Sequence, residues 1–106
     1  MSSIFQGHAD DAVSIAPDFH SIIFEDETTR VIKVTVPPGA SAPMHWHPRT
    51  LNYVLSPGKL RFTDQKGVVT EAELMAGKVT SGPERSHAVE NISDNTVENI
   101  LIEFKI

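Results

Sequence analysis

Three of the five histidines in this 106-residue chain are spaced so that they could bind a metal ion together. His45 and His47 flank Trp46, and alternate residues of a β-strand point to the same face of a sheet. The third, His87, lies forty residues later in a segment that also has the pattern of a strand. If the two strands lie side by side, three imidazoles converge. Such a set suits zinc, iron, nickel, manganese or copper and leaves coordination positions open for water or a substrate.

The composition limits what else the chain can do. It has no cysteine, which excludes disulfides and thiolate metal sites, and its formal net charge of −5 argues against nucleic acid as a partner. Apolar residues make up 40% and charged residues 22%, which is typical of a globular domain. His8 and His20 fall in a weakly patterned N-terminal part, where we assign them to the surface without a role.

The elements that must position the histidines are short strands. Segments rich in Val, Ile, Thr and Phe alternate with turn signals every eight to twelve residues, a spacing typical of an all-β sandwich or barrel. Residues 71–76 could form one helical turn, which Gly77 would end. We predict one domain over residues 1–106, with a barrel core at 30–105. Residues 1–20 form an N-terminal arm, in which 4–5 and 13–15 suggest edge strands.

The N-terminus has neither a basic start nor a long apolar stretch, so we expect no secretory signal. The longest apolar runs span about three residues, far from the roughly 20 that a membrane helix needs. We therefore predict a cytoplasmic protein that does not bind a membrane. As its partner we expect a small molecule and not nucleic acid.

Two segments around the histidines resemble the two motifs of the cupin superfamily. Residues 39–58 are similar to G-x5-H-x-H-x3,4-E-x6-G, with Gly39, His45, His47 and Gly58 at motif positions. Residues 77–91 are similar to G-x5-P-x-G-x2-H-x3-N, although Arg85 stands nearest the central glycine and the stretch from Pro83 to His87 is one residue short. The resemblance covers roughly residues 30–105.

The resemblance implies a double-stranded β-helix, or jelly-roll, barrel, with N-terminal strands swapped or packed onto a homodimer partner. It also implies that His45, His47 and His87 hold a divalent transition metal, such as Fe, Zn, Ni or Mn, inside the barrel. The activity it implies is metal-assisted, for example that of an Fe(II)-dependent dioxygenase acting on a small polar or anionic substrate. The alternatives are a binding or sensor module without catalysis and a degenerate barrel with weak or no metal.

The chain departs from the first motif at its glutamate. The positions where that residue could fall hold Thr50, Leu51 or Asn52, none of which is a carboxylate. Three arrangements remain open. Three neutral histidines hold the metal with water or substrate, as in cysteine dioxygenase-like cupins; Asn52 or Thr50 supplies a weak oxygen ligand; or the barrel is a binding pocket only. Losing the carboxylate makes the site more positive and favours anionic ligands.

Three further residues are candidates for substrate contact. Arg49 follows the histidine pair and could reach an anion at the barrel mouth. Arg61 alternates with apolar residues, so that it faces either the barrel interior or the outer sheet, and Tyr53 is a candidate proton donor. Trp46 lies between two ligands and should point away from them, into the core or an interface.

Overall fold

The computed structural model describes residues 9–105, which fold into two facing β-sheets and one helical turn. The sheets have the strand orders β1-β2-β9-β4-β7 and β3-β8-β5-β6. The elements are α1 (Ala12–Ile15), β1 (His20–Glu25), β2 (Thr29–Val36), β3 (Ser41–His47), β4 (Thr50–Val54), β5 (Gly58–Asp64), β6 (Val69–Leu74), β7 (Val79–Gly82), β8 (Arg85–Asn91) and β9 (Val97–Phe104).

The first sheet is built around β2 and β9, whose residues alternate between buried and partly exposed along their full length. The two strands are antiparallel and in register, so that Ile32 lies opposite Leu101 and Arg30 opposite Glu103. Ile32, Val34, Val36 and Leu101 form the hydrophobic core, as expected for strands with one face turned inward. Arg30 and Glu103 occupy the same inner face at one end.

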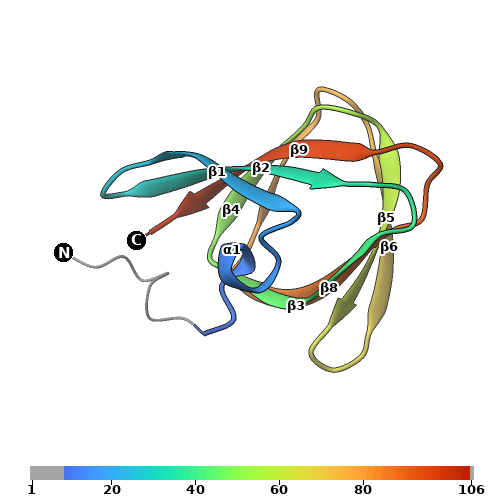
Figure 1. Cartoon of the computed structure of the whole chain (residues 1–106), viewed down its shortest axis with the longest axis horizontal. Helices are drawn as coiled ribbons and strands as arrows, with labels where there is room; N and C mark the ends of the chain where they lie inside the picture. Colours follow the sequence, from blue (N-terminus) through green and yellow to red (C-terminus); the bar gives the residue numbers. More distant parts are fainter. Residues whose placement is uncertain (1–8, 106) are drawn as a thin grey trace.

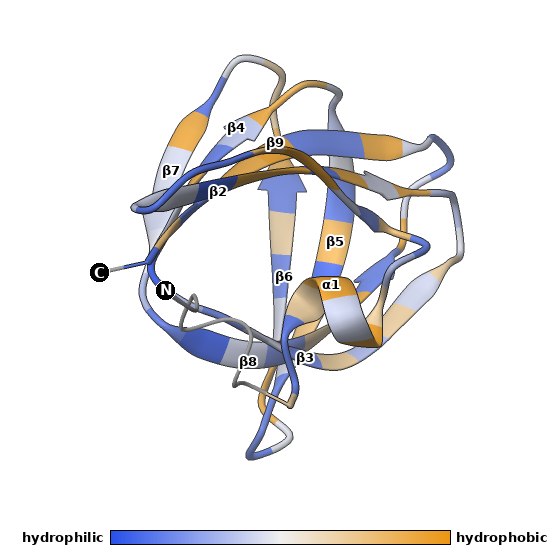
Figure 2. Ribbon diagram, turned by 60° about the vertical axis from the view of Figure 1, so that its left-hand side comes forward, coloured by the Kyte–Doolittle hydropathy of each residue, from blue (hydrophilic) through white to orange (hydrophobic). Residues whose placement is uncertain are grey.

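The two sheets form opposite walls of a barrel. Figure 1 shows β2 and β9 on one wall and β3 and β8 on the other, with α1 packed beside β3. Figure 2 shows hydrophilic and hydrophobic segments alternating along the strands. The space between the walls is a cavity of about 690 Å³ lined by both sheets. The predicted all-β, double-stranded β-helix fold is confirmed.

Two local expectations are wrong. Residues 13–15 lie in the helical turn α1, because the backbone amides of Ile15 and Ala16 bond back to the carbonyls of Asp11 and Ala12. Most of residues 71–76 belong to β6, which pairs with β5, so tertiary pairing overrides the local helical preference. The predicted strand at 4–5 lies outside the described residues.

The five-stranded sheet already begins at His20, well before residue 30, where we placed the start of the barrel core. Its edge strand β1 exposes three consecutive apolar side chains: Ile22, Ile23 and Phe24. The homodimer and the swapped N-terminal strands stay predictions. None of the helices found between residues 9 and 105 is long and apolar enough to cross a membrane.

Candidate metal centre

The strands that carry the three predicted ligands are neighbours. β3 and β8 pair antiparallel, and His45 lies directly opposite His87. The ring centroids of His45 and His47 are 4.8 Å apart, and the ring of His87 lies 4.9 Å from His45 and 5.2 Å from His47. His87 also stacks on Phe62 of β5, at 5.1 Å. The structure therefore brings all three predicted residues together inside the barrel.

A β-bulge in β3 aims the histidine pair at the cavity. The register shifts between Ala42 and His45, so that Pro43 and Met44 together occupy a single step of the ladder. In a regular strand Ala42 and His45 would face opposite sides of the sheet, because they are three positions apart. With the bulge, both line the cavity, and Pro43 and Met44 remain exposed.

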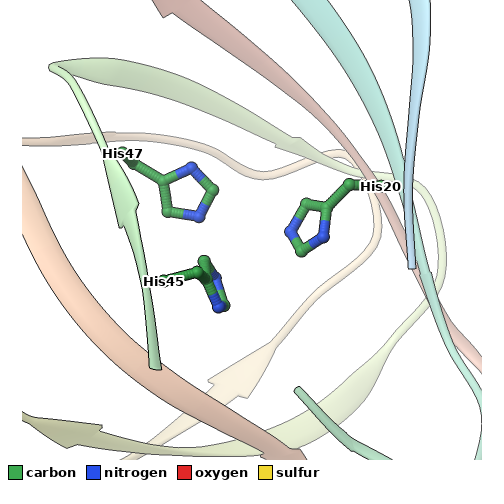
Figure 3. A group of neighbouring side chains, drawn as sticks. All are labelled: His20, His45 and His47. Atoms are coloured by element: carbon green, nitrogen blue, oxygen red, sulfur yellow. The ribbon is translucent and has the colours of Figure 1, made fainter. Parts of the chain in front are cut away.

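His20 is the main correction to the sequence analysis. It is not a surface residue: only 6% of it is exposed, and its ring centroid lies 5.0 Å from that of His45 and 5.7 Å from that of His47. One nitrogen from each of these three rings lies within 4.8 Å of the others. Figure 3 shows His20 entering from β1 and facing the pair on β3. β1 begins shortly after Pro17 and Asp18, residue types typical of turns, and its pairing with β2 places His20 opposite Val34.

The outer nitrogens of these rings are held in place, which leaves the inner ones for a ligand. Nδ1 of His20 lies 2.9 Å from the Ala16 carbonyl, and Nδ1 of His45 lies 2.7 Å from the Pro43 carbonyl. A carbonyl accepts only, so Nδ1 carries the proton in both rings and Nε2 has a bare lone pair. Nε2 of His45 is buried and has no hydrogen-bond partner among residues 9–105. This unsatisfied acceptor beside other imidazoles fits a metal ion.

His47 is held by a buried network of charged residues. Its Nδ1 lies 2.7 Å from Oε2 of Glu103, and Oε1 of Glu103 accepts from Nε of Arg30 at 2.8 Å. Nη2 of Arg30 donates to Oδ1 of Asp11 at 2.5 Å. All four residues are buried. The network therefore joins Asp11, the residue before α1, to β2, β9 and β3. A carboxylate behind a metal-binding histidine fixes its orientation and raises its basicity.

Burial keeps the histidines neutral, which is the form that binds a metal. It lowers the pKa of His45 to about 4 and that of His87 to about 3, and it holds the pKa of His47 well below the ordinary 6.5. The pKa of His20 is also lowered by burial. Burial acts on Glu103 in the opposite direction and raises its pKa to about 7, against the pull of Arg30.

These shifts predict that acid destabilises the metal-free protein. The unfolded chain binds protons at its histidines near pH 6.5, whereas the folded chain binds them only near pH 4 at His45 and pH 3 at His87. Their stabilisation is therefore complete above pH 6.5 and is lost as the pH falls. Glu103 opposes this trend, because its raised pKa makes the folded chain bind a proton more readily than the unfolded chain. It is a single group, whereas four imidazoles act in the other direction. Urea unfolding should show the free energy of unfolding falling by several kcal/mol between pH 6.5 and 4, at about 1.4 kcal/mol per pKa unit. A flat profile would contradict it.

The two candidate oxygen ligands line the same cavity but already have partners. Oγ1 of Thr50 accepts from Nη1 of Arg85 at 3.0 Å, and Oδ1 of Asn52 accepts from the side-chain amide of Asn99. Direct coordination by either stays a prediction. His20, whose Nδ1 is bonded and whose Nε2 is bare, is better prepared to replace the missing carboxylate.

The three candidate substrate contacts lie outside the cavity. Arg49 is exposed and lies over the ring of Phe104, with Cζ 5.0 Å from the ring centroid. Arg61 forms ion pairs with two surface glutamates, and Tyr53 is 43% exposed. None of the three lines the central cavity, so the structure gives them no contact with a molecule held there.

Trp46 points away from the cavity, as expected, and its indole donates to Glu84 at 3.0 Å. Sequence reasoning missed Arg85 as a cavity residue as well as the network behind His47. The signal for Arg85 was its replacement of the glycine in the second motif. His8 lies outside the described residues.

Comparisons with known proteins agree with this fold. No protein-family model matches the chain, and a search of curated proteins finds no relative. Among solved structures, a cupin domain from Bordetella pertussis has a TM-score of 0.76 and 25% identity, covering 82% of this chain and 92% of that chain. A structure of oxalate decarboxylase has a TM-score of 0.57 and 37% identity over 74% of this chain, which spans 22% of that chain.

A predicted oxalate decarboxylase from Thermotoga maritima has a TM-score of 0.55 and 23% identity, covering 74% of this chain and 68% of that chain. At this identity the likeness concerns the fold alone. The inward-facing motif histidines, the double-stranded β-helix and the solved cupins that share it all lead to one assignment: the chain belongs to the cupin superfamily.

Proposed function

We propose that this protein binds one divalent transition metal ion through its buried histidines and uses it to act on a small polar or anionic molecule. The observation that carries the proposal is the set of four imidazoles at the cavity, where Nε2 of His45 is buried and has no partner in the part of the chain that the structure describes. His45 and His47 are the central ligands, and His20 and His87 lie on either side of them.

The donor set narrows the choice of metal. Neutral imidazoles suit Zn, Fe, Ni and Cu, whereas Mn prefers oxygen ligands. The absence of a carboxylate among these donors leaves the full positive charge of the ion in the cavity. When bound, such an ion supplies Lewis acidity toward a carbonyl or carboxylate oxygen. The chain's own contribution is to orient the rings: Glu103 holds His47, and the carbonyls of Pro43 and Ala16 hold His45 and His20.

The cavity supports a small molecule as ligand. Its volume of about 690 Å³ is within the range of small-molecule sites, and apolar residues such as Val34, Val54 and Leu60 line it together with the histidines. Two structural neighbours are an oxalate decarboxylase and a predicted one, whose names indicate a small carboxylate substrate. A metal-assisted reaction on such an anion, including Fe(II)-dependent oxygenation, is the activity that we propose.

A binding or sensor module is the second candidate, and the shortage of carboxylates in the cavity favours it. Among the described residues that line the cavity, Glu73 is the only carboxylate, and its side chain is exposed. Glu103, behind His47, is hydrogen-bonded to Arg30. Neither is placed as a free general base beside the imidazoles, so a role limited to ligand binding needs fewer further groups.

Elemental analysis of protein purified without a histidine tag tests the proposal. We expect close to one transition metal ion per chain, either as purified or after iron or zinc is added to metal-free protein. Oxygen uptake by iron-loaded protein given small carboxylic acids then distinguishes an oxygenase from a binding module. Protein that holds less than about a tenth of an ion per chain, even after metal is added, would overturn the metal assignment.

A further inference from the structure

Arg85 is a cation in the cavity without a carboxylate partner. It begins β8, is only partly exposed and lines the same cavity as the four histidines. Nη1 donates to Oγ1 of Thr50 at 3.0 Å and to the Pro83 carbonyl at 2.8 Å. Both acceptors are neutral, and no ion pair joins Arg85 to an acidic side chain within the described part of the chain.

The other arginines show how unusual this is. Arg30 contacts Asp11 and Glu103, and Arg61 contacts two glutamates. Arg49 is exposed to solvent. Arginine does not lose its proton in proteins, so Arg85 keeps its charge although burial lowers its pKa. Glu103 attracts Arg85 electrostatically but forms no ion pair with it, because its oxygens are bonded to other side chains. A partly buried charge without an ion pair of its own costs free energy, which an anionic ligand would recover.

Three strands hold the guanidinium in one place. Thr50 of β4 and Gly82 of β7 lie opposite each other in the sheet, and the Arg85 side chain packs against both. A Cβ added at Gly82 would lie 2.9 Å from Nη1 of Arg85, closer than such contacts allow, and 3.2 Å from its Cζ, which is tighter than most. Glycine at position 82 therefore leaves the space that the guanidinium occupies.

The free edge of the guanidinium matches a carboxylate. Nη1 is used by Thr50 and Pro83, whereas Nε and Nη2 make no hydrogen bond with the described residues and are not buried without a partner. These two nitrogens form a fork that binds both oxygens of a carboxylate. Because Arg85 lines the cavity together with the histidines, one small molecule can contact both groups.

We propose that Arg85, seated on Gly82 and Thr50, binds a carboxylate group of the ligand, and that a second oxygen of the same small anion faces the histidine cluster. The ligand class is thus a dicarboxylate or a 2-oxo acid. The contact with Arg85 stands by itself, whereas the contact of the second oxygen rests on the proposed metal function.

Calorimetric titration with oxalate, using neutral oxamide as the matched control, tests this site in metal-free and zinc-loaded protein. We expect oxalate to bind both forms, and to bind the zinc-loaded form more tightly. Oxamide has no carboxylate for Arg85, so we expect it to bind neither form. Arg85→Gln should weaken oxalate binding about 10- to 100-fold in both forms, the range expected for a charge-assisted hydrogen-bonded pair. Arg85→Lys should recover part of this loss, and Arg49→Gln should change nothing. The zinc content is measured after each titration.

Gly82→Ala provides a second test that keeps the charge. The added methyl group displaces the guanidinium, so oxalate affinity should fall while the net charge is unchanged. Oxalate affinity that is unaltered in Arg85→Gln or, if that variant does not fold, in Gly82→Ala would overturn the assignment, as would a failure of oxalate to bind either form. A third outcome would separate the two contacts. If zinc does not strengthen oxalate binding, and Arg85→Gln weakens that binding equally with and without zinc, the Arg85 site is retained and the metal contact is rejected.

Discussion

Replacing His45 by alanine is expected to reduce the bound metal from about one ion per chain to nearly none. His45 has the closest ring contacts with its neighbours, and its buried Nε2 has no hydrogen-bond partner among the described residues. Removing one of the central imidazoles leaves too few ligands to compete with water for a divalent ion. Metal content after dialysis, measured by elemental analysis, checks the result, and circular dichroism confirms that the variant is folded.

His20→Ala and His87→Ala test the two histidines that could serve as the third ligand beside His45 and His47. The cupin motifs select His87 as the third ligand, whereas the structure places one nitrogen each from His20, His45 and His47 within 4.8 Å of one another. We expect each variant to weaken metal binding by at least tenfold, because both imidazoles adjoin the central pair. Asn52→Ala is the matched control and tests the oxygen-ligand alternative; its metal affinity should not change. Full metal retention in both His45→Ala and His87→Ala would contradict the site.

The part of the site that the sequence predicts depends on the two-residue repeat of side chains along a strand and on the two motifs. The spacing of His45 and His47 follows from the two-residue repeat of a strand, and the second motif supplies His87. The pairing of β3 with β8 then confirms that these segments are neighbours. The inner face of β9 was not accessible in the same way, because its sequence does not alternate: Asn99 and Glu103 are buried, whereas Ile100 and Ile102 are only partly buried.

The remainder depends on contacts between distant residues, which no local pattern reveals. His20 joins the site because β1 pairs with β2 and thereby turns one residue of a weakly patterned segment inward. Arg30 and Glu103 are 73 positions apart, and a charged residue inside a strand usually indicates a solvent-facing position. The bulge at Pro43 and Met44 is an effect of pairing, so its role in aiming His45 appears only in the folded sheet.

Removing the carboxyl group of Glu103 is expected to destabilise the protein strongly. Glu103 is fully buried, and it is hydrogen-bonded to Arg30 on one side and to His47 on the other. Glu103→Leu removes one of the two acidic side chains that form ion pairs with the buried Arg30, and losing one member of a buried ion pair costs roughly 3–5 kcal/mol. This is a large share of the 5–15 kcal/mol typical of a domain, so urea unfolding of metal-free protein should show it clearly.

The chain contains a matched control for this measurement on the same two strands. Lys33 and Glu98 also pair β2 with β9, at 3.2 Å, but their side chains are 43% and 38% exposed. Glu98→Leu should cost no more than about 1 kcal/mol, because exposed ion pairs contribute little. Glu103→Gln should preserve more stability than Glu103→Leu, and metal affinity should fall by about 10- to 100-fold in both, because His47 loses the carboxylate that orients it. Equal stability costs for Glu103→Leu and Glu98→Leu would mean that the buried network does not stabilise the barrel. Unchanged metal affinity in both Glu103 variants would mean that it does not support the metal site.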